Sequence, residues 1–271
     1  MNNQNGIWSG EYYIKNYPKD KQWIIDYLES LTFNGDETIL DIGCGDGKIT
    51  AKIATLLPEG KVVGIDSSES MIKTAKQAYS DISNLSFKIA DAATFTFGQK
   101  FDYIVSFHVF HYIEDQRSVL QNIKRALKPN GKVIIVTTSP MEKSSVESFF
   151  NAVKPNSKWW IAAENRRKSY YPKTAKEFEK LLEQSGFKIK NIEVILKKIN
   201  FDSLEDASKN FMRWISVQTK LPHNQALELS NEIAQNLYKE QNREQNKSIS
   251  IQLKHLLIEA DFSNLDTILL V

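Results

Sequence analysis

The chain has 271 residues, of which 41% are hydrophobic and 25% charged, and its formal net charge is +2. This length allows a large core, while balanced charge without a basic cluster argues against nucleic acid binding. No stretch reaches the roughly 18 to 20 apolar residues of a membrane helix, and the polar N-terminus lacks a signal-peptide core. The lone cysteine, Cys44, excludes an intrachain disulfide. We therefore expect a soluble cytoplasmic protein that does not act at a membrane.

Strands and helices alternate along the first half of the chain. After an amphipathic helix that we place between Ile14 and Leu31, the predicted strands are Thr38 to Ile42, Val62 to Ile65, Leu85 to Ala90, Phe101 to Phe107 and Lys132 to Thr137. The helices between them are Lys48 to Leu57, Ser68 to Tyr79 and Gln116 to Leu127. Such alternation predicts a doubly wound α/β fold with a parallel sheet, which binds ligands at the carboxyl ends of its strands.

The second half of the chain departs from this alternation. Pro140 to Pro172 is polar yet rich in aromatic residues, and we interpret it as a lid. Its Trp159, Trp160, Tyr170 and Tyr171 either line a pocket or form a small core of the lid itself. The elements that follow are a helix at Thr174 to Ser185, a strand at Phe187 to Ile199, two helices between Ser203 and Asn246, and a last strand at Ile251 to Ala260.

A glycine-rich turn follows the first predicted strand. Gly43, Gly45 and Gly47 have the spacing G-x-G-x-G, and residues without Cβ allow a strand to turn into a helix close to a ligand. A dinucleotide-binding turn would read G-x-G-x-x-G and would require glycine at Lys48. The turn therefore predicts a different cofactor.

Acidic residues accompany this turn and the next two strands. Asp41 and Asp46 flank the turn, where their negative charge repels phosphate and suits a ligand with an ammonium group, such as S-adenosylmethionine. Asp66, some 20 residues further on, is placed to accept hydrogen bonds from the ribose hydroxyls of an adenosine. Asp91 is placed to accept a hydrogen bond from the adenine amino group. Any single aspartate is as easily explained as a helix cap, but capping does not explain the whole set.

These motifs resemble those of class I S-adenosylmethionine-dependent methyltransferases. The resemblance covers about residues 36 to 137 and includes Asp41 to Gly47, Val63 to Asp66, Asp91-Ala92, Phe101-Asp102 and Leu127 to Gly131. It implies a Rossmann-like seven-stranded sheet whose last strand is antiparallel, with S-adenosyl-L-methionine as cofactor. The residues expected at the cofactor are Asp41, Gly43, Cys44, Gly45, Asp46, Gly47, Asp66, Ser67, Met71, Asp91, Ala92 and Phe107. Phe107 is equally explained by packing, and Cys44 by filling a small buried space.

The order of the predicted elements divides the chain by role. We expect an N-terminal helix and cofactor-binding core at 1–139, a lid insertion at 140–173, a return to the core sheet at 174–200, a helical substrate cap at 201–248, and the last strand with a tail at 249–271.

A narrower resemblance lies in the segment Phe107 to Arg117. It is similar to the corresponding segment of juvenile hormone acid methyltransferases and, more loosely, of trans-aconitate methyltransferases, which esterify carboxylic acids. Those enzymes commonly carry tryptophan where this chain has Tyr112, and their N-terminal substrate-contacting glutamine has no clear counterpart unless Gln22 serves. The specific substrate of those enzymes is therefore not assigned to this chain.

Two histidines follow the fourth strand, where an acceptor would meet the methyl group. His111, His108 and the adjacent Tyr112 are the candidate catalytic residues, with structural packing as the alternative for each. Either histidine can donate a hydrogen bond to a carboxylate or act as a base. A carboxylate is ionised at neutral pH and needs no base, whereas a phenol, amine or carbon acid usually does.

The leading hypothesis is O-methylation of a small organic carboxylic acid. C- or N-methylation of a small metabolite, a protein that binds the cofactor without turnover, and a nicotinamide-dependent oxidoreductase on a related sheet are the alternatives. No metal is expected to take part, because His223 and His255 show no ligand spacing.

Overall fold

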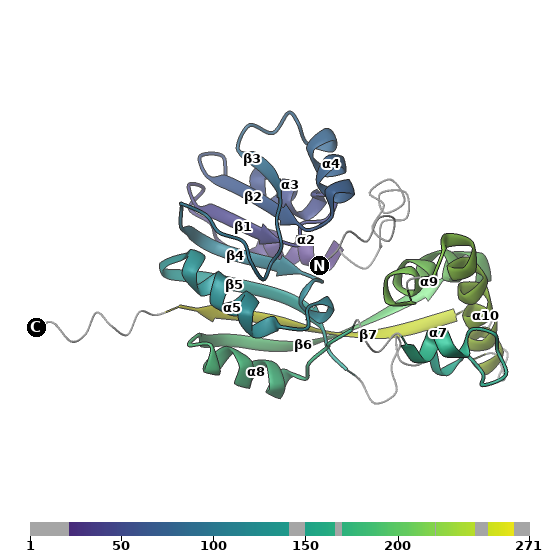
Figure 1. The fold of residues 1–271 in the computed structure, drawn as a ribbon. Coiled ribbons are helices and arrows are strands. Elements are labelled where there is room, and N and C mark those ends of the chain that lie inside the picture. Colours follow the sequence, from purple (N-terminus) through teal and green to yellow (C-terminus); the bar gives the residue numbers. More distant parts are fainter. Residues whose placement is uncertain (1–21, 141–149, 166–169, 220, 242–248, 263–271) are drawn as a thin grey trace, which may run out of the picture.

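A seven-stranded sheet with strand order β3-β2-β1-β4-β5-β7-β6 organises the chain (Figure 1). The computed structural model describes residues 22–140, 150–165, 170–219, 221–241 and 249–262. The strands are β1 (Thr38–Ile42), β2 (Lys61–Asp66), β3 (Leu85–Ile89), β4 (Phe101–Phe107), β5 (Leu127–Thr138), β6 (Lys188–Phe201) and β7 (Ile249–Asp261). Neighbouring strands pair in parallel except that β7 is antiparallel to both β5 and β6. The predicted fold is confirmed.

The helices are α2 (Gln22–Ser30), α3 (Lys48–Thr55), α4 (Glu69–Ala78), the 3₁₀ turn η2 (Phe110–Tyr112), α5 (Gln116–Ala126), α7 (Trp160–Asn165), α8 (Ala175–Gln184), α9 (Leu204–Thr219) and α10 (His223–Gln241). Helices α2 and α3 cover one face of the sheet, helices α5 and α8 cover the other, and the long helices α9 and α10 lie beyond the sheet. The predicted start of the first helix at Ile14 lies outside the described residues.

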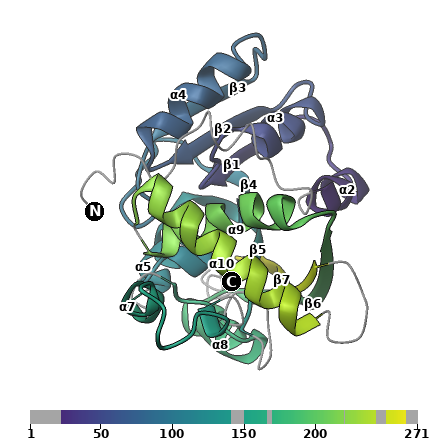
Figure 2. The same ribbon diagram turned by 90° about the vertical axis from the view of Figure 1, so that its right-hand side faces the viewer.

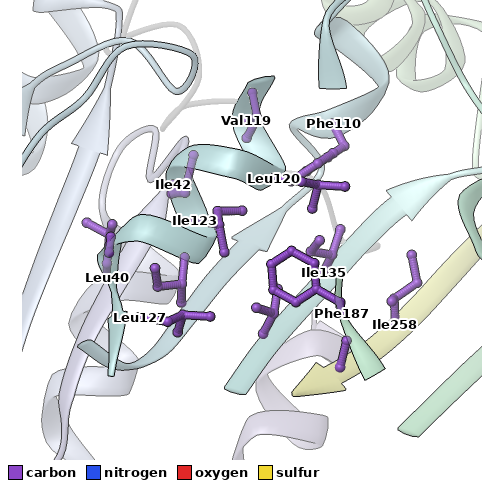
Figure 3. Packing of buried hydrophobic residues seen from close by; sticks show 14 of the residues in the cluster. Leu40, Ile42, Phe110, Val119, Leu120, Ile123, Leu127, Ile135, Phe187 and Ile258 are labelled. Atoms are coloured by element: carbon purple, nitrogen blue, oxygen red, sulfur yellow. The ribbon is translucent and has the colours of Figure 1, made fainter. Parts of the chain in front are cut away.

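Alternate residues of the central strands divide the core into two layers. Leu40 and Ile135 pack with residues of α5 and α8 on one face, as Figure 3 shows for Leu120 and Ile123 of α5. Ile39 and Ile134 pack with residues of α2 and α3 on the other face. This follows from the period of two along a strand, which sends neighbouring side chains to opposite faces.

Most predicted boundaries differ from the observed ones by one or two residues, whereas one turn and two short elements differ in kind. The turn at Pro129 to Gly131, expected to precede a strand beginning at Lys132, is part of β5, because Leu127 already pairs with Phe101 and the register shifts before Tyr103. The turn η2 and the short helix α7 were not predicted, since both are too short to show a helical period.

Strands β6 and β7 continue past the end of the sheet as a two-stranded ribbon (Figure 1). β5 ends at Thr138, which pairs with His255, whereas β7 begins six residues earlier, at Ile249, opposite Phe201 of β6. Six residues of strand extend about 20 Å. Because β5 ends there with its carboxyl end, the ribbon projects from the edge of the sheet where ligands bind.

A helical lobe stands at the end of this ribbon. Helices α7, α9 and α10 share a hydrophobic core with both strands, and its members include Phe150, Trp159, Phe211, Ile233 and Ile251. Parts of the lid (140–173) and of the cap (201–248) therefore pack as one unit. Figure 2, viewed from the lobe side, shows α9 and α10 in front of the sheet.

The lobe core predicts a stability effect. Phe211 is fully buried and meets Phe201 edge to face at 5.2 Å between ring centroids. The substitution Phe211→Ala should lower the free energy of unfolding, measured by urea denaturation, by about 3 to 5 kcal/mol. Ile161→Ala, in the same lobe but 73% exposed, is the control and should change it by less than about 0.5 kcal/mol. Equal effects of the two substitutions would contradict this assignment of the core.

Candidate functional site

The glycine turn between β1 and α3 has a backbone that only glycine adopts readily. Gly43, Gly45 and Gly47 have φ angles of 75°, 57° and 81°, in the left-handed region. The turn is held to the end of β2, because the backbone N–H groups of Gly43 and Cys44 both donate to the carbonyl of Ile65, at 2.7 and 2.9 Å. The turn therefore has a fixed shape at the edge of the sheet.

The surroundings of the three glycines differ. A Cβ on Gly43 would lie 2.1 Å from Cγ2 of Val109, and one on Gly47 would lie 2.6 Å from Cζ of Phe87. At Gly45 no heavy atom lies within 4 Å of the Cβ position. Packing thus requires glycine at the first and third positions, whereas the second faces open space.

The acids of the turn are buried. The carboxylate of Asp41 accepts a hydrogen bond from the Thr50 hydroxyl at 2.7 Å, and Asp46 accepts from the backbone N–H of Lys48 at 3.4 Å. Burial, followed by the charge of Asp41, raises the pKa of the Cys44 thiol. Cys44 is therefore a neutral, buried side chain at neutral pH.

Asp66 connects the end of β2 to the turn. One carboxylate oxygen accepts from the backbone N–H of Gly45 at 3.0 Å and the other from that of Ser68 at 2.8 Å. Asp91, after β3, accepts from the backbone N–H of Ala93 at 2.8 Å. Each aspartate thus orders its own loop, and a carboxylate that accepts two hydrogen bonds still has lone pairs for a ligand.

The other expected cofactor residues lie in different surroundings. Ser67 is exposed beside Asp66, and Met71 is buried on α4, where its backbone N–H is capped by Ser68. Ala92 is half-buried, and its carbonyl accepts from the Asn122 side chain at 3.2 Å. Phe107 belongs to the core layer beneath α2 and α3, a position that supports packing as its role.

The segment after β4 lies against the glycine turn. Val109 contacts the position where Gly43 lacks a side chain, so the His108 to Tyr112 segment and the turn are neighbours. His108 has a φ of 60°, unusual for a residue with a side chain, and its backbone N–H donates to the Val136 carbonyl at 2.7 Å. The residues expected at an acceptor and those expected at the cofactor are thus brought together.

His111 is held in one tautomer. It is 3% exposed, and its Nδ1 accepts a hydrogen bond from the backbone N–H of Thr138 at 3.3 Å, with the Thr137 hydroxyl at 3.2 Å. A backbone N–H can only donate, so Nδ1 of the neutral ring has no hydrogen and Nε2 carries it. In this tautomer Nε2 is the ring nitrogen that can donate a hydrogen bond.

Aromatic rings surround His111. Its ring centroid lies 4.3 Å from that of Tyr112 and 5.5 Å from that of Tyr170, and the Tyr170 hydroxyl shares a 2.7 Å hydrogen bond with the Thr138 hydroxyl. Gln116 holds this arrangement by donating to the carbonyls of Phe110 and Tyr171, both at 2.9 Å.

The aromatic residues of the predicted lid divide between two places. Trp159 is in the core of the lobe and Trp160 packs against it, whereas Tyr170 joins His111. The backbone N–H of Tyr171 donates to the His111 carbonyl at 2.7 Å.

Sequence reasoning missed Thr50, Gln116, Thr137, Thr138 and His255. A signal for His255 was present, because it interrupts the apolar alternation of the last strand.

Within the parts of the chain that the structure describes, no three or more His, Cys, Asp or Glu side chains are grouped to hold a metal ion. No described helix is long and apolar enough to cross a membrane.

Comparison with known proteins places these features in a family. A family model described as a methyltransferase domain matches residues 33–244, which is more than half of the chain. Protein 235L of Invertebrate iridescent virus 6 is 34% identical over 149 residues, 54% of each chain. Juvenile hormone acid O-methyltransferase of Bombyx mori is 28% identical over 186 residues, 64% of this chain and 65% of that enzyme. Both matches thus span less than two thirds of the relative's length.

Solved structures share the fold. The YcgJ protein of Bacillus subtilis superposes with a TM-score of 0.62 at 19% sequence identity, covering 90% of this chain and 97% of that one. At this identity the likeness shows the fold alone.

The packing around Gly47 predicts that the turn tolerates no side chain there. Gly47→Ala places a methyl group against Phe87 in a left-handed conformation, and should lower the free energy of unfolding by about 3 kcal/mol. Gly98→Ala is the control, since Gly98 has no close neighbour and no left-handed φ, and should be near neutral. Chemical denaturation measures both, and a Gly47→Ala protein as stable as wild type would contradict the turn geometry.

Proposed function

Since the chain belongs to the methyltransferase domain family, with S-adenosyl-L-methionine as its methyl donor, we propose that the methyl acceptor is the carboxylate of a small organic acid. The observation that carries this proposal is the tautomer of His111. With Nδ1 occupied by the Thr138 N–H and a hydrogen on Nε2, the ring has no lone pair left to act as a base. A carboxylate is the kind of acceptor that needs no general base, because it is already ionised at neutral pH.

The glycine turn and Asp66 fit the donor. The open space at Gly45 leaves room for a ligand to approach the backbone, as a glycine cradle requires. Asp66 accepts one backbone N–H on each oxygen, and its remaining lone pairs suit the two ribose hydroxyls. The buried charges of Asp41 and Asp46 favour the ammonium group of the methionine moiety. Asp91 is assigned to the adenine amino group.

In the mechanism, S-adenosyl-L-methionine supplies a methyl group already activated by its sulfonium charge. His111 donates through Nε2 to the acceptor carboxylate and orients it. The ring of Tyr112 and the Tyr170 ring exclude water from His111, which leaves the carboxylate less solvated and more nucleophilic. No residue takes up a proton during the reaction, because the ester forms from an acid that is already ionised.

The relatives and the sequence support the same acceptor class. The Bombyx mori relative is by its name an acid O-methyltransferase, and the segment Phe107 to Arg117 resembles that group of enzymes. The lone buried Cys44 suits a reducing compartment, so the cytoplasm is part of the proposal.

A panel of acceptors tests the proposal. The protein is incubated with S-adenosyl-L-methionine labelled in its methyl group and, separately, with decanoate, benzoate, citrate, catechol or octylamine. We expect base-labile label on at least one of the three acids. If only catechol or octylamine is labelled, the carboxylate proposal is contradicted, and the acceptor is instead an oxygen or nitrogen nucleophile that needs a base.

Gly45→Ala should separate cofactor binding from folding. Alanine in the left-handed conformation of this position (φ 57°) should lower the free energy of unfolding by about 1 to 2 kcal/mol, and its methyl group would occupy the open space beside the turn. We expect the Kd for S-adenosylhomocysteine, measured by calorimetry, to rise at least about tenfold, with Gly98→Ala unchanged. If Gly45→Ala binds S-adenosylhomocysteine with wild-type affinity, the cofactor does not bind at this turn.

His111 variants distinguish a donor from a base. His111→Gln keeps both hydrogen bonds, because its amide oxygen can accept from Thr138 and its amide nitrogen can donate, whereas His111→Phe keeps neither. For the methylated acid we expect kcat/KM to fall less than about threefold in His111→Gln and about tenfold or more in His111→Phe. Loss of a general base would lower it by about 10² to 10⁴ in both variants.

A further inference from the structure

Ser139, the residue after β5, lies on the same face of the sheet as His111. Its backbone N–H donates to the Lys254 carbonyl at 2.9 Å, so the ladder between β5 and β7 continues one residue past Thr138. Because side chains alternate along a strand, Ser139 points to the same side as Thr137, whose hydroxyl lies 3.2 Å from Nδ1 of His111. Ser139 is therefore the next side chain on that face, about 6.6 Å further along the strand towards the carboxyl edge of the sheet.

The Ser139 hydroxyl is buried and has no hydrogen-bonding partner among the described residues. The residue is 6% exposed, so bulk water does not supply a partner either. A buried hydroxyl without a partner is destabilising. In native proteins such a group points to a ligand or an ordered water that accepts or donates the hydrogen bond.

The charged side chains of the ribbon on this face are basic. Lys254 lies opposite Ser139 and is half-buried, and it forms no ion pair with any described residue. Lys198 follows along the ribbon, opposite Gln252. Leu256, on the same face, belongs to the core beneath α5 and α8, which identifies the side of the sheet.

The acids near this face are turned away from Ser139 or already hydrogen-bonded. Glu193 and Glu259 lie on the opposite face of the ribbon, where Glu259 accepts a hydrogen bond from α2. Glu114 is exposed and hydrogen-bonded to the Tyr171 side chain. The acids at the starts of α5 and α8 cap those helices. The surroundings of the Ser139 hydroxyl therefore favour an anion that accepts hydrogen bonds.

We propose that Ser139 is a second hydrogen-bond donor to the acceptor carboxylate, beside His111, and that Lys254 supplies the positive charge that favours an anion there. This inference rests on the proposed function and assigns part of acid recognition to β5 and β7. His111 and Ser139 donate to the oxygen that becomes the ester carbonyl. The other oxygen keeps its lone pairs, one of which forms the bond to the methyl carbon as the bond from that carbon to sulfur breaks.

Two donors at one site favour an acceptor with two oxygens. A phenol or an amine has a single reacting atom, and each hydrogen bond donated to that atom occupies a lone pair needed for attack on the methyl group. A carboxylate separates the two tasks, because one oxygen is held while the other reacts. Ser139 thereby selects acids over acceptors with one nucleophilic atom.

Kinetics of Ser139 variants test the donor. The substrate is whichever of decanoate, benzoate and citrate the wild-type protein methylates. In Ser139→Ala we expect KM for the acid to rise about tenfold while kcat changes less than about threefold, because the lost bond is made to the carboxylate before its charge is lost. Ser139→Thr keeps the hydroxyl and should stay within about threefold of wild type in both constants. Ser185→Ala is the control, since it removes a buried hydroxyl at the end of α8 and should leave KM unchanged.

Stability and binding measurements separate recognition from folding. Because the Ser139 hydroxyl has no partner within the described protein, Ser139→Ala should unfold in urea with a free energy at least equal to that of wild type. In protein saturated with S-adenosylhomocysteine, calorimetry should show the Kd for the acid about tenfold higher in Ser139→Ala, with the Kd for S-adenosylhomocysteine unchanged.

Salt dependence tests the lysine. The wild-type Kd for the acid should rise with sodium chloride concentration, and it should rise less steeply in Lys254→Gln, because salt screens a cation that attracts the acid. Lys188→Gln, at the other end of β6 and exposed, is the control and should keep the wild-type salt dependence.

The outcomes that overturn the inference differ in what survives. If an acid is methylated but Ser139→Ala keeps the wild-type KM and Kd for it, or if Ser139→Thr loses as much as Ser139→Ala, the proposed function stands and Ser139 is not a donor. If Lys254→Gln keeps the wild-type Kd and salt dependence, the assignment of Lys254 is wrong. If no acid of the panel is methylated, the carboxylate proposal fails and the inference fails with it.

Discussion

One strand, β7, fixes the position of the helical lobe relative to the sheet. Its second half pairs with β5 inside the sheet, and its first half pairs only with β6 and enters the lobe core. A continuous strand cannot shift by one residue without turning its apolar side chains to the opposite face. The register Thr138 to His255 is therefore set by two cores at once, and it holds the lobe over the carboxyl edge of the sheet where the glycine turn and His111 meet.

The chemistry follows from hydrogen bonds that the backbone imposes on side chains. The Gly45 and Ser68 N–H groups orient the Asp66 carboxylate, and the Thr138 N–H determines the tautomer of His111. In both cases the backbone at the end of a strand positions a polar side chain. Such preorganisation suits the proposed reaction, in which the enzyme mainly positions an acceptor that is already ionised.

The sequence predicts the sheet well because its strands are short apolar runs bounded by glycine and proline, and because the glycine turn has strict steric requirements. It predicts less of the lobe, since the contacts among Trp159, Phe211 and Ile233 join residues far apart in the chain and leave no local period. The same limit applies to the site. Tyr170 and His255 reach His111 and His108 only through tertiary folding, whereas the segment after β4 was visible as a motif.

The length of β6 has a consequence for association between molecules. It is the last strand of the sheet, and no other strand of the described residues pairs with its outer edge along its 14 residues, where Val194 and Leu196 are both exposed. An edge of this kind is a template for another chain. Four lysines, at 188, 190, 197 and 198, and the register shift between Ile189 and Asn191 lie along this strand. Charge repulsion and an irregular backbone thus protect β6 from pairing with a second copy of itself, which allows the ribbon to be long without promoting aggregation.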